Sequence, residues 1–471
     1  MTRNVVVLCL DTVRKDYFDD FAPKLSAAAD VSFAQCRAAS SWSPPSHASM
    51  LTGQLPHQHG VHAFCPEFDA LSREDTLFGD LPNHEAVGVS ANVYASSGFG
   101  FDTLFDTFEE VSPKRRFSGG MDVETFGQEN SHEGVRKYAA YLRAALGHDH
   151  PLQSVLNGAF ATLDDLAGSL PVAKPFDDGA TAVLRRARRQ VERRSGPFVQ
   201  FVNVMEAHAP HTPIRGYDDS VYDVPTTWTS HDFDSFEINV HGETKAHEDD
   251  LGRFRDLYSA AIDYLDRHVA AYVEWLLAET DRETTVLVTA DHGENLGLPS
   301  DDGGMVAHSA SCSEGLLHVP LAVVNPPAGY PARVEEFVSH LALRRLVVGL
   351  ATGETPDISA GPKEMVAERI GSNATSDRLT DAEATRISRT IRCAYDGDRK
   401  FEWDTTGYTA RHELSWDRPN WQKTVEESVD VTPYEGRFGT PIEAVGVRAC
   451  NASDADVDEG TRNRLEDLGY L

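Results

Sequence analysis

Three short, predominantly apolar runs stand out in the hydrophobic pattern of the chain. They are Val5–Leu10, Phe198–Met205 and Thr285–Ala290, and each is rich in β-branched or aromatic residues. Runs of this length and composition are typical of strands that are buried on both faces of a parallel sheet. We therefore predict that they form central strands of an α/β fold.

Polar residues follow each of these runs directly. Asp11 follows the first run, Glu206 and His208 follow the second, and Asp291 follows the third. Open α/β sheets place their functional sites at the carboxyl ends of their strands. We expect these side chains to share one site.

A helical pattern lies between the second and third runs. From Leu257 to about Glu279, apolar residues recur at spacings of three and four and form one apolar stripe. Helices alternating with strands predict a doubly wound, mostly parallel sheet.

The pattern also suggests how the chain is organised. Residues 1–350 are expected to form the larger α/β domain, with an insertion at about 112–179 over or beside the site. After about Thr355, polar and apolar residues alternate over short stretches, for example from Arg389 to Trp403. This alternation predicts a smaller α+β domain with an antiparallel sheet at 351–471.

The charge balance is strongly acidic. Asp and Glu total 74 against 43 Lys and Arg, which gives a formal net charge of −31. Such a charge disfavours binding to nucleic acid. Because most of the basic residues are arginines, we interpret the acidity as adaptation to a salt-rich, halophilic cytoplasm, where salt screens the repulsion.

Neither a membrane span nor a disulfide framework is predicted. The apolar run after the first four residues is far shorter than the ~20 residues that a transmembrane helix needs. The six cysteines are scattered without a CxxC pair, so we interpret them as reduced thiols. A cytoplasmic location is the expectation.

One serine stands out in the densest local pattern of the chain. Ser43 precedes Pro44 and Pro45, ahead of a helix that we expect to begin near Ser46. A hydroxyl at a helix N-terminus is well placed to attack an anionic ester, because free N–H groups and the helix dipole attract the oxyanion. The alternative is a serine that only caps the helix.

Two further patterns are candidates for metal chemistry. Asp291-His292-Gly293-Glu294 places an acid and an imidazole directly after a strand, and these groups suit a divalent cation. His208 and His211 flank Pro210, and they are either a ligand cluster or part of an ordinary loop.

Taken together, these patterns resemble one family in order and spacing, the sulfatase family of the alkaline phosphatase superfamily. The resemblance covers nearly the whole chain except the insertion. The segments that carry it are Asp11–Arg14, Phe21–Leu25, Ser41–Gly53, Ala91–Asn92, Gly100–Asp102, His208–Pro210, Tyr264–Asp266, Asp291–Glu294, His318–Leu321 and Arg464–Leu471.

The resemblance implies roles for individual residues. One divalent cation, Ca²⁺, Mg²⁺ or Mn²⁺, is expected in the site. The implied metal ligands are Asp11, Asp291, His292 and Ser43. Ser43 is also the implied nucleophile, and the other implied catalytic or substrate-binding residues are His208, His308, His47, Asn92 and His211.

The chain departs from the family pattern in two places. Thr12 stands where many sulfatases have a second Asp. His47 replaces the Arg that directs conversion of the nucleophile to formylglycine, so we predict that Ser43 stays unmodified. His57, His59 and His62 are either ligands of a second cation or loop residues, and we favour the loop.

The function implied is metal-dependent hydrolysis of a sulfate or phosphate ester, of a small molecule or a glycan, through Ser43. The alternatives are a phosphoryl or phosphoglycerol transferase that uses the same site, and a catalytically inactive member of the family.

Overall fold

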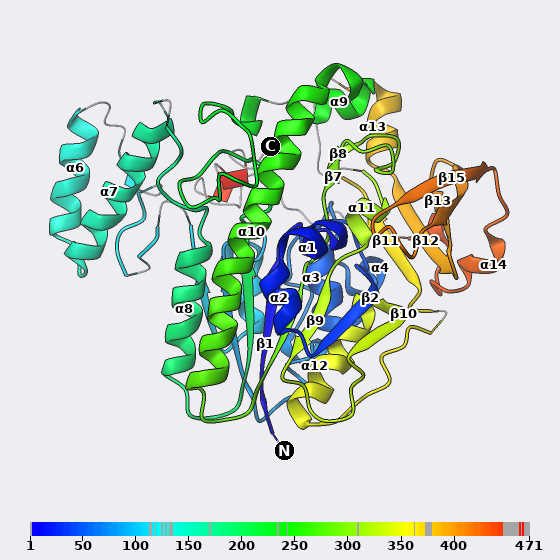
Figure 1. Cartoon of the computed structure of the whole chain (residues 1–471), viewed down its shortest axis with the longest axis horizontal. Helices are drawn as coiled ribbons and strands as arrows, with labels where there is room; N and C mark the ends of the chain where they lie inside the picture. Colours follow the sequence, from blue (N-terminus) through cyan, green and yellow to red (C-terminus); the bar gives the residue numbers. More distant parts are fainter. Residues whose placement is uncertain are drawn as a thin grey trace.

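The computed structural model describes residues 2–445, apart from 113–114, 118, 124–125, 128–129, 131–134, 169, 171, 233–234, 243, 309, 362 and 373–378, together with residues 461–462 and 464–465. This part of the chain contains two large sheets and a two-stranded ribbon (Figure 1). The eight-stranded sheet has the order β10-β2-β9-β6-β1-β5-β3-β4, and the five-stranded sheet has the order β11-β12-β13-β14-β15. Of the stretch Arg464–Leu471 that contributed to the resemblance, residues 466–471 lie outside the described residues.

The strands and helices have the following bounds. The strands are β1 Asn4–Leu10, β2 Val31–Arg37, β3 Glu85–Ser90, β4 Thr107–Glu110, β5 Phe198–Val204, β6 Thr284–Thr289, β7 Asn295–Leu296, β8 Val306–Ala307, β9 Leu321–Val324, β10 Arg333–Ser339, β11 Val366–Ile370, β12 Thr390–Asp396, β13 Arg399–Asp404, β14 Thr409–Leu414 and β15 Gln422–Glu427. The α-helices are α1 Lys15–Phe21, α2 Pro23–Ala28, α3 Ser43–Thr52, α4 Pro56–His59, α6 Val135–Leu146, α7 Pro151–Gly168, α8 Ala180–Glu192, α9 Ser235–His241, α10 Glu248–Glu279, α11 Glu314–Leu317, α12 Leu343–Thr352, α13 Asp381–Ile387 and α14 Thr432–Glu435.

The three predicted central strands lie side by side at the centre of the large sheet. β1 runs parallel to both β5 and β6, and Val6 pairs with Gln200 on one side and with Val286 on the other. Every residue of these three strands is buried. β9 is antiparallel to its neighbours β2 and β6, so the sheet is mixed but mostly parallel.

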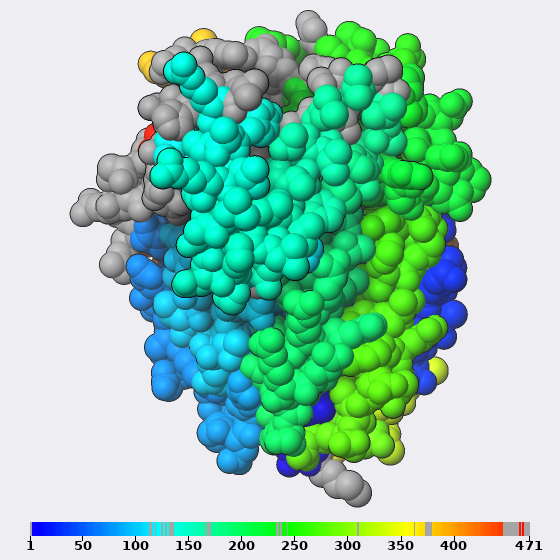
Figure 2. All heavy atoms as spheres, turned by 90° about the vertical axis from the view of Figure 1, so that its left-hand side faces the viewer, coloured from blue at the N-terminus to red at the C-terminus, as the bar shows by residue number. Residues whose placement is uncertain are grey.

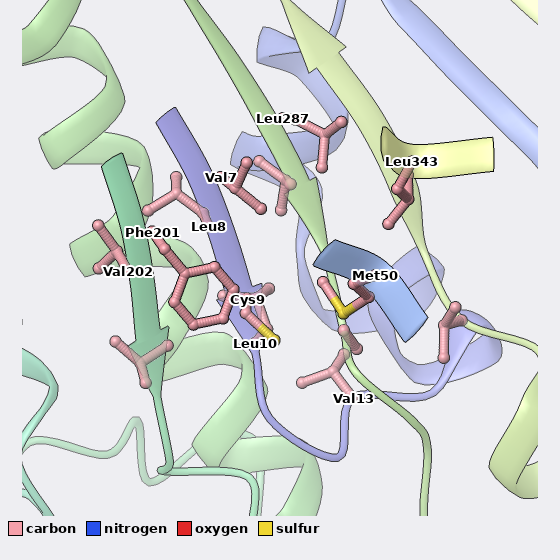
Figure 3. Close-up of a cluster of buried hydrophobic side chains, with 14 of the residues drawn as sticks. Val7, Leu8, Cys9, Leu10, Val13, Met50, Phe201, Val202, Leu287 and Leu343 are labelled. Atoms are coloured by element: carbon pink, nitrogen blue, oxygen red, sulfur yellow. The ribbon is translucent and has the colours of Figure 1, made fainter. Parts of the chain in front are cut away.

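Helices cover both faces of this sheet. Gln200 of β5 faces α8 and α10, where its Nε2 donates to the backbone of α8 and its Oε1 accepts from the Tyr272 hydroxyl at 2.7 Å. Phe201 points to the opposite face, because successive side chains of a strand alternate. There it shares an apolar cluster with Met50 of α3 and Leu343 of α12 (Figure 3). The predicted doubly wound fold is confirmed.

The predicted helix α10 begins earlier than its apolar stripe, at Glu248. Its first turn carries three acidic residues, which interact favourably with the positive end of the helix dipole. In its middle, the Asp266 carboxylate accepts hydrogen bonds from the backbone N–H groups of Lys24 and Leu25, at 3.0 and 2.7 Å. Two segments of the family resemblance therefore meet at the start of α2, where they hold the helices together.

The antiparallel sheet predicted for the C-terminal part is confirmed, and a buried charge network joins it to the large sheet. Arg37, the last residue of β2, donates to Glu314 Oε2 at 2.7 Å. The other carboxylate oxygen of Glu314 accepts from the Tyr395 hydroxyl of β12 at 2.8 Å. Lys400 of β13 lies 3.8 Å from the same oxygen. The contact between the sheets is therefore partly ionic.

The insertion contains two packed helices, α6 and α7, which the sequence analysis did not predict. Figure 2 faces this side of the molecule, where the insertion lies over the upper part of α8. Leu142, Leu152 and Leu163 are exposed on these helices. The periodicity was weak because apolar residues point to the solvent as well as inward.

The cysteines differ from the prediction at one position. Cys9, Cys36, Cys312 and Cys393 are free and buried, as expected. Cys65, however, is disulfide-bonded, so the expectation of reduced thiols is wrong there. Among the described helices, none is long and apolar enough to cross a membrane.

Candidate functional site

Two buried carboxylates and two amides meet at the carboxyl edge of the large sheet. Asp11 follows β1, and its Oδ2 accepts hydrogen bonds from Nδ2 of Asn92 at 2.7 Å and of Asn203 at 3.3 Å. Asn92 follows β3, and Asn203 lies near the end of β5. These amides come from strands on one side of β1, and they fix the orientation of the Asp11 carboxylate.

The second carboxylate, Asp291, follows β6 on the other side of β1. Its Oδ1 accepts from the backbone N–H of Thr12 at 3.2 Å and of His292 at 2.9 Å. Thr12 has a φ of 61°, in the left-handed region that is unfavourable for a β-branched residue. This strained backbone is offset by the contact that it makes with Asp291.

One imidazole completes a group with the geometry of a metal site. Within the described part of the chain, ligand atoms of Asp11, His47 and Asp291 lie within 4.8 Å of one another. Asp11 Oδ1, Asp291 Oδ2 and His47 Nδ1 are buried without a hydrogen-bond partner. Unpartnered buried carboxylate oxygens are costly. Carboxylate oxygens and an imidazole nitrogen fit a divalent cation.

The electrostatics of this group also fit a cation. Burial and the negative charge of Asp291 raise the pKa of Asp11 well above its ordinary value. Against the effect of burial, the neighbouring imidazoles of His292 and His47 lower the pKa of Asp291 to about 2. Burial lowers the pKa of His47 to about 4, so this imidazole is neutral near pH 7 and offers a lone pair.

His47 lies beside both carboxylates, whereas the sequence analysis placed it with the substrate groups. Its Nε2 is 3.1 Å from Asn203 Nδ2 and 3.6 Å from Asp291 Oδ2. The buried helix α3 carries it there, and the Ser46 hydroxyl donates to the Asp291 carbonyl at 2.5 Å. The side chain that replaces the family's Arg thus contacts the predicted metal ligands.

Ser43 is the first residue of α3, and its hydroxyl is not used as a helix cap. The N-cap position is Trp42 in extended conformation, and prolines occupy the first turn. Ser43 Oγ lies 3.2 Å from His292 Nε2. His292 Nδ1 is 2.8 Å from the Gly293 carbonyl, which requires that Nδ1 carries the proton. The lone pair of Nε2 therefore points toward Ser43.

His208 and His308 form a second group of imidazoles beside His292. The ring centroid of His308 lies 5.1 Å from that of His208 and 4.9 Å from that of His292. Mainly through burial, the pKa of each of His208 and His308 falls to about 4. Glu294 Oε1 lies 3.3 Å from His308 Nδ1, and burial raises the pKa of Glu294 to about 7.

His211 lies against α10. Its ring centroid is 5.1 Å from that of Phe254 and 6.0 Å from that of Tyr258, and its backbone N–H donates to Ser230 Oγ at 2.6 Å. Burial is the main cause that lowers its pKa to about 3. These contacts are those of a packed side chain, and its predicted role in substrate binding stays a prediction.

The histidines His57, His59 and His62, in and near α4, are not part of the Asp11–His47–Asp291 group. His57 Nδ1 is 2.8 Å from Glu368 Oε2, in β11 of the C-terminal sheet. His59 Nε2 is 3.1 Å from Ser49 Oγ. His57 and His59 belong to the short helix α4 and not to a loop, and the assignment of these histidines stays a prediction.

Asn203 and Glu294 were not among the predicted site residues. Asn203 is a polar residue within an apolar strand, near the end where Asp11 and Asp291 follow their own strands. This position, near the carboxyl end of a central strand, could have identified Asn203 as a site residue from the sequence. Glu294 belongs to the Asp291–Glu294 segment, but only the fold brings it to His308.

The fold and this site define a member of the alkaline phosphatase superfamily. The model of the family "Sulfatase" matches residues 3–353, and the chain belongs to the sulfatase family. A curated relative, "Uncharacterized sulfatase YidJ" of Escherichia coli (strain K12), is 26% identical over 188 residues, which are 37% of this chain and 35% of that protein. The match thus spans about a third of the relative's length.

Solved structures support the fold across the chain. The phosphonate monoester hydrolase SpPMH from Silicibacter pomeroyi aligns with a TM-score of 0.55 and 15% identity, over 100% of this chain and 96% of that one. BT1596, a 2-O GAG sulfatase, aligns with a TM-score of 0.54 and 14% identity, over 93% and 87% of the two chains. At these identities the likeness concerns the fold.

Proposed function

We propose that the chain is a metal-dependent hydrolase of phosphate esters that uses Ser43, unmodified, as its nucleophile. The observation that carries the proposal is the position of the Ser43 hydroxyl, at the N-terminus of α3 and 3.2 Å from the His292 lone pair. The Asp11–His47–Asp291 group adjoins it, because His292 Nε2 also lies 3.5 Å from Asp291 Oδ2.

Asp11, His47 and Asp291 would hold the cation. When bound, a divalent cation supplies Lewis-acid chemistry, which neutralises charge on the ester and on the attacking oxygen. His292 can offer the lone pair of its Nε2 either to that cation or to the proton of the Ser43 hydroxyl. The distance of 3.2 Å between Nε2 and Ser43 Oγ is that of a hydrogen bond, so it favours the second role.

The chain's own residues suffice for the proton transfers of a two-step displacement. In the first step, Ser43 Oγ forms a bond to phosphorus, the bond to the leaving oxygen breaks, and the Ser43 proton passes to His292. The leaving oxygen takes a proton from the His208–His308–Glu294 group, where Glu294 has its pKa raised to about 7. In the second step, water forms a bond to phosphorus and gives its proton back to the His208–His308–Glu294 group, while the bond between phosphorus and Ser43 Oγ breaks and His292 returns its proton to Oγ.

His47 supports the preference for phosphate over sulfate. It stands where the maturation of sulfatases to formylglycine uses an Arg, and it contacts Asn203 and Asp291 instead. A plain alcohol must leave its covalent intermediate through attack of water at the bound sulfur or phosphorus. Phosphoserine intermediates are ordinary in metal-assisted catalysis, so phosphate monoesters, diesters or phosphonate esters suit this site best.

Replacement of the nucleophile tests the proposal. We expect Ser43→Ala to reduce turnover of an aryl phosphate by at least ~10³-fold, because the covalent step is lost, while metal affinity falls only modestly. Turnover, metal titration and thermal unfolding are measured together. Ser49→Ala is the matched control, since Ser49 lies on the same helix and contacts His59.

Two results would contradict this assignment. One is a mass for the Ser43 peptide that corresponds to an aldehyde or its hydrate. The other is faster turnover of an aryl sulfate than of the matched aryl phosphate.

A further inference from the structure

A second polar cavity lies away from the Asp11–Asp291 group, between α8 and the insertion. It has a volume of about 180 Å³, and Phe117, Gly119 and Gln153 of the insertion form part of its wall. Figure 2 faces this side of the molecule. We call the cavity the arginine pocket, because five arginines line it: Arg116, Arg185, Arg186, Arg189 and Arg193.

Three of these arginines form no side-chain hydrogen bond or ion pair with the described residues. Arg185 and Arg189 are four residues apart on one face of α8, and Arg193, the C-cap residue of this helix, continues the spacing. Like charges at this spacing on a helix repel each other and destabilise it. Other arginines of this segment are engaged, since Arg188 packs on the Trp275 ring at 4.6 Å and Arg194 pairs with Glu85 at 2.7 Å.

The deepest arginine of the pocket is held by neutral groups. The side chain of Arg186 is almost fully buried, and its guanidinium donates to the backbone carbonyls of Glu110, Arg115 and Arg116. Burial lowers the pKa of Arg186 to about 10; Glu109 opposes this effect and the neighbouring arginines add to it. Among the described residues, Asp177 is the one carboxylate that pairs with an arginine of the pocket, at 2.9 Å from Arg116. The pocket therefore carries uncompensated positive charge.

This concentration of positive charge contrasts with the composition of the chain. Acidic residues outnumber basic ones by 74 to 43, yet none of the described residues that line the pocket carries a carboxylate. Guanidinium groups bind sulfate and phosphate through paired, charge-assisted hydrogen bonds. A cavity needs a volume of roughly 10–15 Å³ to hold one water. The arginine pocket, with about 180 Å³, therefore has room for an oxyanion and several waters. It is smaller than the sites of large organic ligands.

We propose that the arginine pocket is a binding site for a sulfate or phosphate group, separate from the Asp11–Asp291 group. The bound group is either a free inorganic oxyanion or an additional anionic group of an ester that carries several. The binding site does not depend on the function proposed above, because binding needs no turnover.

Titration with inorganic sulfate tests the proposal. The full chain, freed of metal, is titrated calorimetrically at constant ionic strength set with chloride; under these conditions Asp11 and Asp291 repel anions from the other site. We expect Arg185→Gln/Arg189→Gln to bind sulfate at least ~10-fold more weakly than the wild type, because charge-assisted hydrogen bonds are lost. Arg333→Gln is the control, since Arg333 is exposed on β10 at the other edge of the sheet.

Equal sulfate affinity in the wild type and the double variant would overturn the proposal, as would the absence of sulfate binding by the wild type. A second measurement distinguishes the two sources of the ligand. If the pocket takes a further group of the substrate, the double variant raises KM for an ester that carries a second phosphate or sulfate group and leaves KM unchanged for an ester that carries one. If it takes a free oxyanion, sulfate binding is lost and both KM values stay the same.

Discussion

At the scale of single residues, the spacing along α3 explains how two chemical groups reach one site. Ser43 and His47 are four residues apart, so their side chains lie on the same face of the helix. Asp11 and Asp291 were predictable because each directly follows an apolar strand. The contacts of His47 were not, because they depend on how α3 packs across the sheet, and no local pattern encodes that packing.

The paired carboxylates make a prediction about Asp11→Asn that needs no substrate. In the wild type, a divalent cation at ~100 times its Kd should stabilise the fold by ~2.7 kcal/mol, because only the folded chain gathers the ligands. We expect the variant to lose most of this effect. Without metal, the variant should be at least as stable as the wild type, since one of two buried carboxylates is removed. Denaturant unfolding with and without Mn²⁺ measures both values.

Asp291→Asn should also lose most of the stabilisation by metal. This result would show that both carboxylates bind the same cation, whereas an effect of Asp11→Asn alone would not. Exposed Asp80, which pairs with Arg344, provides the control variant Asp80→Asn. Full metal stabilisation of Asp11→Asn would show that the cation binds elsewhere.

At the scale of helices and strands, the sequence was most informative where one face or both faces of an element are buried. β1, β5 and β6 were predicted nearly to their ends, because apolar residues predominate on both faces of each strand, even though Gln200 and Asn203 interrupt β5. The helices α6 and α7 of the insertion gave no clear periodicity, because they expose leucines. The network around Glu314 was also missed, because its partners are far apart in the sequence and meet only after both sheets have formed.

The network around Glu314 makes a prediction about acid stability. Burial raises the pKa of Glu314, but the positive charges of Arg37 and Lys400 lower it by a larger amount. The pKa of Glu314 therefore lies below its ordinary value of 4.5. A lowered folded-state pKa stabilises the protein above the unfolded-state value, and this contribution is lost as pH falls through the folded-state pKa. We expect Glu314→Gln to cost ~3–5 kcal/mol near pH 7, because it leaves buried cations unpaired. The difference should shrink below about pH 4.

Denaturant unfolding of both proteins over this pH range gives the comparison. Glu335→Gln is the control, because the exposed pair of Glu335 with Arg333 should contribute no more than ~1 kcal/mol. A cost for Glu314→Gln that is independent of pH would assign its effect to packing and not to charge.

At the scale of the whole molecule, the net charge of −31 makes a prediction about salt. Repulsion between carboxylates opposes the compact state and is screened within ~10 Å at 0.1 M salt. We expect the midpoint of thermal unfolding to rise as potassium chloride is added. Chloride is the appropriate anion, because sulfate would also bind the arginine pocket. A midpoint that stays constant or falls with salt would contradict this expectation.

The pairing of β1 determines the order in which the sheet can form during synthesis. Val6 pairs with Gln200 and Val286, so β1 leaves the ribosome long before either neighbour exists. Until then, the nascent chain carries an apolar strand with both edges open, which is the kind of segment that aggregates or binds chaperones. Asp11 and Asp291 likewise come together only after most of the chain has been translated. A protein truncated before β6 therefore lacks both the completed sheet and the carboxylate pair.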